Sequence, residues 1–530
     1  MADILSYFPM AAPRDRQVKA LQFVAERVRQ GFQDIVIAAP TGIGKSGIGS
    51  ALAYWTAELP LAGDECPGAY YLVTQKLLQD QLERDFNRYK PGCNDGQLIK
   101  TAEEYECPLF KNCGAGGRAP RGCAQRREEN CGYKLQKAKF LRAKLAVTNY
   151  PYFFAERTYS GELKNRQLLA LDECHSLPDQ IMRFMDITVG LAELTRWTRD
   201  QEMPDLASVT DYAAWLKDEF VPPASELLEE LLALTDLDDD NSREVVELDK
   251  FICKVNRAVE RMTADPRQWV CWRDDYRGKP GFQYTARPLS AAPFNDLILG
   301  AAPVRIYMSA YPGVKDVFCR ELGLDPAKVA WASLGSSFSP KRRPVISLPL
   351  GSMGSASKQE FLKTNLSAVA KLAGRHAAER GIIHCGSYEM GQQIADVLAA
   401  NGQGDRVIYP KSADDREQAF KDHGESANGI LISPSMMEGF DFAGDLARWQ
   451  IIAKVAFPYL GDQHVKAKMA LDEDWYLGRA VMSTIQAAGR VCRSDDDFGV
   501  TYIIDSDFRR LYERTKAMWP KWFQDAVIFA

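Results

Sequence analysis

The sequence predicts an α/β protein with two lobes, each built on a parallel sheet, and the first lobe is interrupted twice. Apolar strands alternate with helical segments in the first 177 residues and again from residue 304 onward, a pattern typical of parallel sheets covered by helices. A cysteine-rich stretch at 106–133 and a helical region at 190–265 form the interruptions. The 530 residues allow several domains, and 46% apolar with 26% charged residues is typical of a soluble globular chain.

The first series of strands begins close to the N-terminus. A helical pattern at 17–32 precedes an apolar strand at 34–39, which leads into a glycine-rich turn. Further apolar strands are predicted at 69–75, 144–150 and 167–173. Their alternation with helical segments favours a parallel sheet.

The region between the two series is predicted to be a helical insertion. Apolar residues recur at helical spacing through 190–265, and Pro222 and Pro223 are expected to break the pattern. The acidic run at 236–244 is predicted to be a solvated loop.

The second series forms the other lobe. Its strands are predicted at 381–387, 428–435, 449–458 and 499–505, after a strand at 304–310 that completes the first lobe. No repeat of solenoid period and no long low-complexity linker separates them.

The N-terminus lacks a basic region followed by an apolar run, and no segment approaches 18 consecutive apolar residues. We therefore expect neither a signal peptide nor a membrane span, and a cytoplasmic, reducing compartment that disfavours disulfides. The net charge of −5 does not indicate nucleic acid, but the residues from Lys111 to Lys144 include ten Lys or Arg and only two Glu. A solvated face is the ordinary explanation, and a phosphate-contacting surface is the functional one.

The segment APTGIGKS, residues 39–46, lies between a predicted strand and a predicted helix, as a phosphate-binding loop does. Two glycines would let backbone N–H groups point at phosphate oxygens. Lys45 would neutralise the β and γ phosphates, and the Ser46 hydroxyl would ligate Mg²⁺. Ala39 stands where the consensus has glycine, so a chance glycine-rich turn is the alternative. The predicted nucleotide-contacting residues are Pro40, Thr41, Gly42, Ile43, Gly44, Lys45 and Ser46.

The segment LALDECHS, residues 169–176, places two carboxylates at the end of a strand. Asp172 could hold Mg²⁺ and Glu173 could polarise water. An acidic pair at a strand end is common, and His175 could be an ordinary polar loop residue. The order of the pair, downstream of the phosphate loop, favours the catalytic interpretation.

The segment QAAGRVCRS, residues 486–494, is predicted to place Gln486, Arg490 and Arg493 on one face of a helix. A basic surface helix is the ordinary interpretation. In the functional one, the two arginines stabilise charge on the transferred phosphoryl group and Gln486 positions water. The three motifs in this order indicate an ATPase.

Four cysteines occupy residues 107–131: Cys107, Cys113, Cys123 and Cys131. Their spacing lacks the paired Cys-x2-Cys of zinc ribbons. Four thiolates suit either Zn²⁺ or a 4Fe–4S cube, so the ligand count leaves both open.

These motifs resemble those of superfamily 2 helicases, and more narrowly those of the XPD/DinG-like group. APTGIGKS and DECH are similar to motifs I and II, and QAAGRVCR to motif VI. YMSAYP at 307–312 resembles the Ser-Ala-Thr motif III, with Tyr311 in place of Thr. SPSMMEGFDFAGD at 433–445, with KVAFPY after it, resembles motif V, and RDRQ at 14–17 resembles the adenine-recognition element. The resemblance adds three nucleotide-contacting residues: Gln17, Glu438 and Asp441.

The resemblance implies two RecA-like lobes, the first interrupted by a small Cys-rich iron–sulfur domain and a helical arch. It implies ATP, Mg²⁺ and a 4Fe–4S cluster on the four cysteines, with zinc as the alternative. Lobe one is expected at 1–102, 141–177 and 286–325, the cluster domain at 103–140, the arch at 178–285 and lobe two at 326–530.

The activity implied is ATP-driven 5′ to 3′ translocation on single-stranded DNA, with forked or bubble DNA as substrate. The motor is expected to be monomeric, with or without a larger nucleic-acid-processing complex. An RNA helicase should lack the cysteine insertion, and a fused nuclease would need a further acidic domain. An adaptor with a dead ATPase is favoured only by Tyr311.

Overall fold

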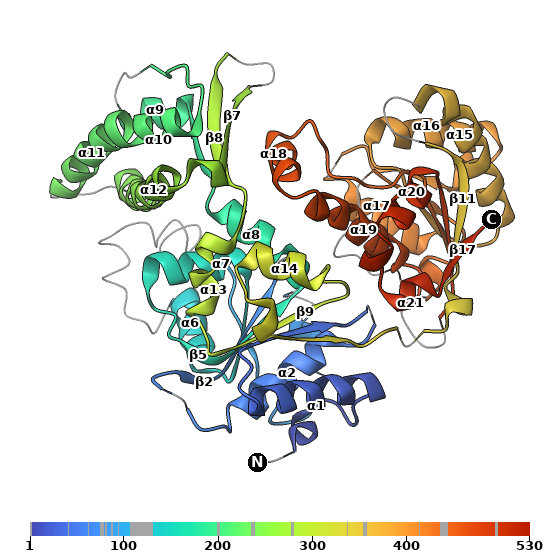
Figure 1. Ribbon diagram of the computed structural model, residues 1–530, viewed down its shortest axis with the longest axis horizontal. Coiled ribbons are helices and arrows are strands. Elements are labelled where there is room, and N and C mark those ends of the chain that lie inside the picture. Colours follow the sequence, from blue (N-terminus) through green and yellow to red (C-terminus); the bar gives the residue numbers. More distant parts are fainter. Residues whose placement is uncertain are drawn as a thin grey trace.

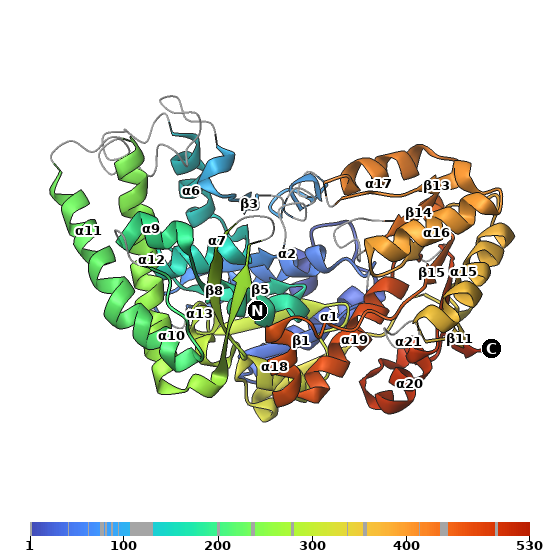
Figure 2. The same ribbon diagram turned by 90° about the horizontal axis from the view of Figure 1, so that it is seen from above.

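The computed structural model contains two parallel sheets of seven strands each and a smaller antiparallel sheet (Figure 1). The arch lies above lobe one and lobe two lies to the right in Figure 1, and lobe one lies between the other two in Figure 2. The structure describes residues 3–530 except 41, 62, 75–78, 80–81, 86–87, 94, 106–130, 199–201, 235–238, 277–279, 337, 353–357, 413, 435–441, 443 and 493–496.

The sheet of lobe one has the strand order β10-β1-β9-β5-β2-β4-β3, and all its pairings are parallel. In register, Ala38 lies opposite Ser309, and Asp172 lies opposite Met308. The carboxyl ends of three neighbouring strands therefore meet at one edge, where α/β sheets bind ligands. The strands are β1 (Asp34–Ala38), β2 (Cys66–Val73), β3 (Gln97–Leu98), β4 (Leu145–Asn149), β5 (Arg166–Asp172), β9 (Val304–Ser309) and β10 (Val329–Ser333).

Helices cover both faces of this sheet. Along β1, Ile35 and Ile37 pack into one apolar cluster and Val36 packs into the other. Successive side chains of a strand point to opposite faces, so a wholly apolar strand indicates a sheet buried on both sides. The covering helices named below are α1 (Asp15–Arg29), α2 (Lys45–Thr56), α6 (Gly132–Arg142), α7 (Tyr150–Ala155), α8 (Leu177–Phe184), α13 (Asp296–Leu299) and α14 (Lys315–Leu322).

The last strand of lobe one lies beyond the boundary predicted at residue 325. β10 pairs with β1, from Asp34 opposite Val329 to Ala38 opposite Ser333. The strand is only five residues long and includes two alanines and a serine, so it gave no distinct apolar signal. The sheet of lobe one therefore continues to residue 333.

The arch is not wholly helical, which corrects the expectation for residues 178–285. An antiparallel sheet in the order β6-β8-β7 forms its base, and its strands are β6 (Ile187–Gly190), β7 (Trp269–Asp275) and β8 (Phe282–Pro288). Its helices are α9 (Leu191–Thr198), α10 (Val209–Trp215), α11 (Val221–Ala233) and α12 (Asp239–Ala264).

Two further expectations about the arch are wrong. The acidic run is a loop only in part, because α12 already begins at Asp239. Pro222 and Pro223 do not break the helical path, because they lie in the first turn of α11, where an N–H donor is not required. A π-helical turn precedes them and ends with the Val221 N–H bonded to the Leu216 carbonyl.

The sheet of lobe two has the order β13-β14-β12-β15-β16-β11-β17 and is also parallel. Its strands are β11 (Val345–Gly351), β12 (Gly381–His384), β13 (Val407–Ile408), β14 (Ile430–Ser433), β15 (Trp449–Ile452), β16 (Val500–Asp505) and β17 (Val527–Phe529). Its helices are α15 (Lys358–Arg375), α16 (Tyr388–Ala400), α17 (Arg416–Glu425), α18 (Gln463–Leu471), α19 (Glu473–Ala488), α20 (Asp507–Arg514) and α21 (Lys521–Gln524).

The helical hairpin α18–α19 of lobe two makes ion pairs with lobe one. Arg479 on α19 pairs with Asp179 on α8 at 2.5 Å. Arg320 on α14 pairs with Asp472, which lies between the two hairpin helices, at 2.5 Å. A third, buried pair joins Lys468 to Glu321. The hairpin thus fixes the two sheets relative to each other in this structure.

None of the helices in the described part of the chain is both long and apolar enough to span a membrane. Even the 26-residue α12 carries charged residues along its length.

Candidate nucleotide site between the two lobes

The predicted phosphate loop turns sharply between β1 and α2. The Ala39 N–H donates to the Ser309 carbonyl at 2.8 Å, which extends the β1–β9 pairing by one bond. Gly42 and Gly44 have φ of 83° and 84°, the left-handed region that side chains disfavour. Lys45 then begins α2. This geometry, a tight turn that opens a helix N-terminus, is suited to an anion, and Thr41 lies outside the described residues.

Gln17 binds the backbone of this loop. Its side chain is 4% exposed, donates through Nε2 to the Ile43 carbonyl at 2.8 Å, and accepts from the Arg14 N–H at 2.8 Å. A Cβ atom at Gly44 would lie 2.7 Å from Nε2, so the loop approaches Gln17 closely. The amide is engaged with the loop backbone in this structure, and its contact with adenine stays a prediction.

Lys45 and Glu173 form an ion pair, with Nζ 2.7 Å from Oε1. Glu173 has φ 48° and is the one residue other than glycine with positive φ among those described. Such strain is typical of functional sites. Loss of solvation raises the pKa of the Glu173 carboxyl, but Lys45 and His175 outweigh this and hold the pKa well below its usual value. Glu173 is therefore an ionised acceptor that faces the phosphate loop.

Asp172 is held by two buried tyrosines. The Tyr71 hydroxyl donates to Oδ2 at 3.0 Å, and the Tyr150 hydroxyl donates to the Asp172 carbonyl at 2.7 Å. The Glu173 N–H donates to Oδ1 at 2.9 Å. Loss of solvation raises the pKa of Asp172 to about 6, although Lys45 opposes the shift. A divalent cation would favour the ionised form, so this carboxylate fits Mg²⁺, and Ser46, in the first turn of α2, is the second predicted ligand.

His175 connects the acid pair to lobe two. Its Nδ1 lies 2.9 Å from Ser309 Oγ and 3.3 Å from Glu173 Oε2. Its Nε2 lies 2.8 Å from the amide nitrogen of Gln486 on α19. Because that amide nitrogen is a donor, Nε2 accepts and the ring proton lies on Nδ1, facing Ser309 and Glu173.

The predicted helical face of Gln486, Arg490 and Arg493 is wrong in part. Helix α19 ends at Ala488, and Gly489 caps it, so Gln486 is helical and Arg490 is not. Arg490 follows the helix end; burial lowers the pKa of His384, and the Arg490 charge adds to this shift. Arg493, Glu438 and Asp441 lie outside the described residues. The structure thus connects Lys45, Glu173, His175 and Gln486 by successive contacts between the two lobes, with Asp172 next to Glu173.

Tyr71, Tyr150, His175 and Ser309 are site residues that sequence reasoning left without a role. What they share in the sequence is their position. Each lies in, or within three residues after, one of four strands that are neighbours in the sheet. The contacts themselves could not be read from the sequence, because they join side chains across strands whose order was unknown.

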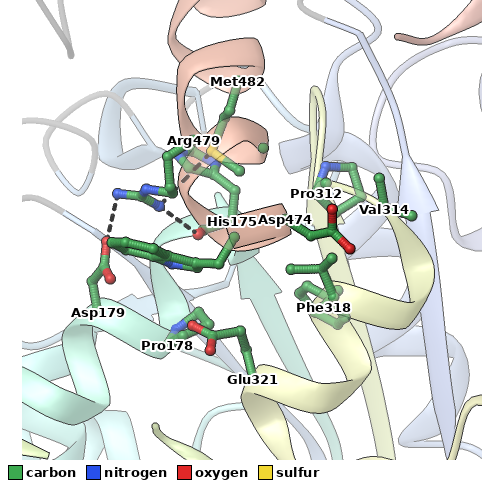
Figure 3. Close-up of a pocket in the computed structure, with 14 residues that line it drawn as sticks. His175, Pro178, Asp179, Pro312, Val314, Phe318, Glu321, Asp474, Arg479 and Met482 are labelled. Atoms are coloured by element: carbon green, nitrogen blue, oxygen red, sulfur yellow. Dashed lines mark hydrogen bonds and ion pairs between the residues drawn. The ribbon is translucent and has the colours of Figure 1, made fainter. Parts of the chain in front are cut away.

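A cavity of about 40 Å³ lies beside this cleft, between lobe one and α19 (Figure 3). Arg479 crosses it and donates to Asp179 at 2.5 Å and to the His175 carbonyl at 3.4 Å. Pro312 and Met482 line it from opposite lobes (Figure 3).

Three of the four clustered cysteines, Cys107, Cys113 and Cys123, lie outside the described residues. Cys131 is described as a free thiol, 5% exposed, directly before α6. Within the described ranges, no three His, Cys, Asp or Glu side chains gather in a way that could hold a metal ion.

Known proteins match both lobes of this chain. A model of the helicase C-terminal domain matches residues 373–526, and a model of the res subunit of type III restriction enzymes matches residues 10–196. The regulator of telomere elongation helicase 1 homologs of Caenorhabditis elegans and Caenorhabditis briggsae are each 32% identical over 17% of this chain. These matches span 10% of the length of each relative.

Solved structures of XPD proteins share the fold. An XPD helicase superposes with a TM-score of 0.61 at 14% identity, covering 98% of this chain and 100% of that one. The S. tokodaii protein Xpd4 superposes with a TM-score of 0.55 at 11% identity, again covering 98% and 100%. Together with the two family models, these matches support the resemblance to the XPD/DinG-like superfamily 2 helicases, and the shared fold has two RecA-like lobes. The family implies ATP and Mg²⁺.

Proposed function

We propose that this protein is an ATP-driven DNA helicase that translocates 5′ to 3′ on single-stranded DNA. The observation that supports it best is the chain of contacts between the lobes. Lys45 pairs with Glu173 in lobe one, and Glu173 contacts His175, which in turn bonds to Gln486 of lobe two. A nucleotide in such a cleft couples hydrolysis to the relative position of the lobes.

The described residues suit distinct steps. Lys45 would move from Glu173 to the β and γ phosphates, which frees that carboxylate to polarise water. Asp172 and Ser46 would hold Mg²⁺, which neutralises developing charge when bound. Gln486 would orient the water, and Arg490 with Arg493 would stabilise charge on the transferred phosphoryl group.

The basic run at 111–144 supports contact with a nucleic-acid backbone, but not every residue is available. Lys137 is 11% exposed at its side chain and pairs with Glu156 and Glu162, each at 2.7 Å. Lys144 pairs with Glu58 at 2.8 Å. Lys139 and Arg142 are exposed on α6 and remain the described candidates for phosphate contact.

The preference for DNA over RNA rests on the cysteine-rich insertion between the phosphate loop and the acid pair. We propose that Cys107, Cys113, Cys123 and Cys131 hold a 4Fe–4S cluster, with zinc as the alternative. Cys131 fits this role, since it is a buried free thiol at the junction of the insertion and lobe one. The ultraviolet–visible spectrum of anaerobically purified protein, with iron and zinc analysis, distinguishes the two metals.

The activity is tested by ATP hydrolysis with single-stranded DNA, duplex DNA and RNA at several salt concentrations. Single-stranded DNA should stimulate hydrolysis far more than duplex. The stimulation should fall steeply with salt, because the counterion release that drives binding becomes less favourable as the salt concentration rises. Equal stimulation by RNA would favour the RNA helicase instead.

The insertion is tested by Cys113→Ser. A small polar segment depends on its metal to stay folded, so we expect loss of the metal and of unwinding on a forked duplex. Basal hydrolysis should largely survive, because both sheets have their own cores. Normal unwinding with unchanged iron content would contradict the cluster proposal.

A further inference from the structure

Tyr311 belongs to lobe one by sequence but packs into lobe two. It follows β9 by two residues and is 6% exposed. The other described members of its apolar cluster all lie between Val345 and Ala526. This is the position at which the chain departs from the Ser-Ala-Thr motif, and a threonine there could not reach as far.

The tyrosine hydroxyl fixes the ring in place. It donates to the Met518 carbonyl at 2.5 Å. That carbonyl belongs to a short helical turn, Lys516–Met518, and the turn is itself held by the Trp519 indole N–H, which donates to Thr515 Oγ1 at 3.0 Å. The acceptor is therefore a rigid part of lobe two.

On the side of lobe one, the segment before Tyr311 touches both halves of the nucleotide site. The Ser309 carbonyl accepts from Ala39 at the start of the phosphate loop. Ser309 Oγ lies 2.9 Å from His175 Nδ1 and 3.4 Å from Glu173 Oε2. Ser309, two residues before Tyr311, therefore links this segment directly to Glu173 and His175.

On the side of lobe two, the cluster around Tyr311 includes the buried face of α19. Leu477, Val481 and Ile485 all belong to it. The next residue on that helix, Gln486, bonds to His175. Tyr311 and Gln486 are therefore two ties between the same two lobes, one apolar and one polar, and Pro312, the residue after Tyr311, lines the interlobe cavity (Figure 3).

We propose that Tyr311 is a positioning residue that holds α19, and with it Gln486, against His175 at the nucleotide cleft. The inference rests on the proposed ATPase for its consequence and on the described contacts for its geometry. Lobe one alone carries the groups that would bind the phosphates, so loss of this tie should impair turnover and spare nucleotide binding.

The test compares Tyr311→Thr and Tyr311→Phe with Tyr512→Thr, which makes the same truncation in the same cluster from within lobe two. For Tyr311→Thr we expect kcat to fall by about tenfold or more, with affinity for a non-hydrolysable ATP analogue within about twofold. Tyr311→Phe, which keeps the ring and loses one hydrogen bond, should lose about two- to tenfold. Tyr512→Thr should lower the melting temperature but keep kcat near the parental value below it.

Hydrogen–deuterium exchange is the readout that does not depend on activity. Amides of 307–314 and 515–519 should exchange faster in Tyr311→Thr, whereas Tyr512→Thr should affect only lobe two. Parental kcat and exchange in Tyr311→Thr, or an equal loss of kcat in Tyr512→Thr, would overturn the proposal. If the parent itself fails to hydrolyse ATP, the proposed function is wrong, and the exchange pattern alone then decides whether the tie exists.

Discussion

The two halves of the nucleotide cleft are built differently. In lobe one, the phosphate loop follows β1 and the acid pair lies at the end of β5. These strands flank β9 in one sheet, and Tyr71 and Tyr150 hold Asp172. In lobe two, Gln486 ends a helix, and Arg490 lies beyond it. The first half is fixed within one lobe, whereas the second depends on how α19 docks across the interface.

This difference separates binding from turnover. The groups that would bind the nucleotide in the ground state are held within lobe one. The groups that would act mainly in the transition state belong to lobe two, and they reach the site only when the lobes are correctly placed. Differential stabilisation of this kind raises kcat without tightening substrate binding. Variants in the two halves should therefore differ in kind as well as in size.

Lys45→Ala should have the largest effect, because it removes the cation of lobe one that faces the phosphates. We expect ATP hydrolysis to fall to background, with the fold intact by circular dichroism. Lys144→Ala is the matched control, since that lysine forms a surface pair with Glu58 and should leave activity near the parental rate. Parental ATP turnover in Lys45→Ala would contradict the assignment of Lys45 to the nucleotide site.

Arg490→Ala tests the half in lobe two. Loss of a charge that acts in the transition state should lower kcat by about 10²–10³-fold while binding of labelled ATP stays near the parental level. Arg493→Ala should behave in the same way. Arg514→Ala, which breaks an exposed pair with Glu473, is the control. Equal losses of binding and turnover would show that these arginines belong to the ground-state site.

Acid should weaken lobe two before lobe one. Four of the five histidines lie at 376–464, and burial lowers the pKa of His384 and of His464 to about 4. Unfolding restores an ordinary pKa near 6.5, so the unfolded chain binds more protons between these values and stability falls as pH drops from about 6.5 to about 4. The loss for His464 should reach up to about 3 kcal/mol.

Urea melts followed between pH 7 and pH 4 measure this loss. His464→Gln keeps a group that can donate to the Pro288 carbonyl, which His464 contacts at 2.9 Å, and should flatten the dependence. An unchanged slope in His464→Gln and in His384→Gln would contradict the assignment.

Tyr71→Phe should have the smallest effect. It removes the hydroxyl that donates to Asp172 Oδ2 and leaves the ring packed against Gly49. A single hydrogen bond to a carboxylate is worth about 1.5–3 kcal/mol at most, and Mg²⁺ partly replaces it. We expect a several-fold rise in the Mg²⁺ concentration for half-maximal hydrolysis, measured by titration, with little change in kcat at saturation.

The sequence predicted what short segments encode. The glycine-rich turn, the acid pair and the parallel sheets were all recognisable, because each depends on residue types at fixed spacing. The end of α19 was missed, because a helix-compatible pattern continues past Gly489 and only the cap stops it. The sheet of the arch was missed, because β7 and β8 are amphipathic strands that follow a long helical run. Tyr311 looked like a defect of its motif, since its partners lie about 200 residues downstream.

The two ends of the undescribed stretch 106–130 are already joined to each other in lobe one. The Tyr105 and Tyr133 rings lie 5.5 Å apart, and the Tyr133 hydroxyl lies 2.8 Å from that of Tyr152. Arg166, buried at the start of β5, donates to the Phe140, Leu141 and Ala143 carbonyls and so fixes the far end of α6. With the stems clamped, the entropy of closing the loop depends only weakly on what lies between them. A short glycine–serine bridge in place of 106–130 should therefore leave a folded, nucleotide-binding motor, which makes this stretch an exchangeable module.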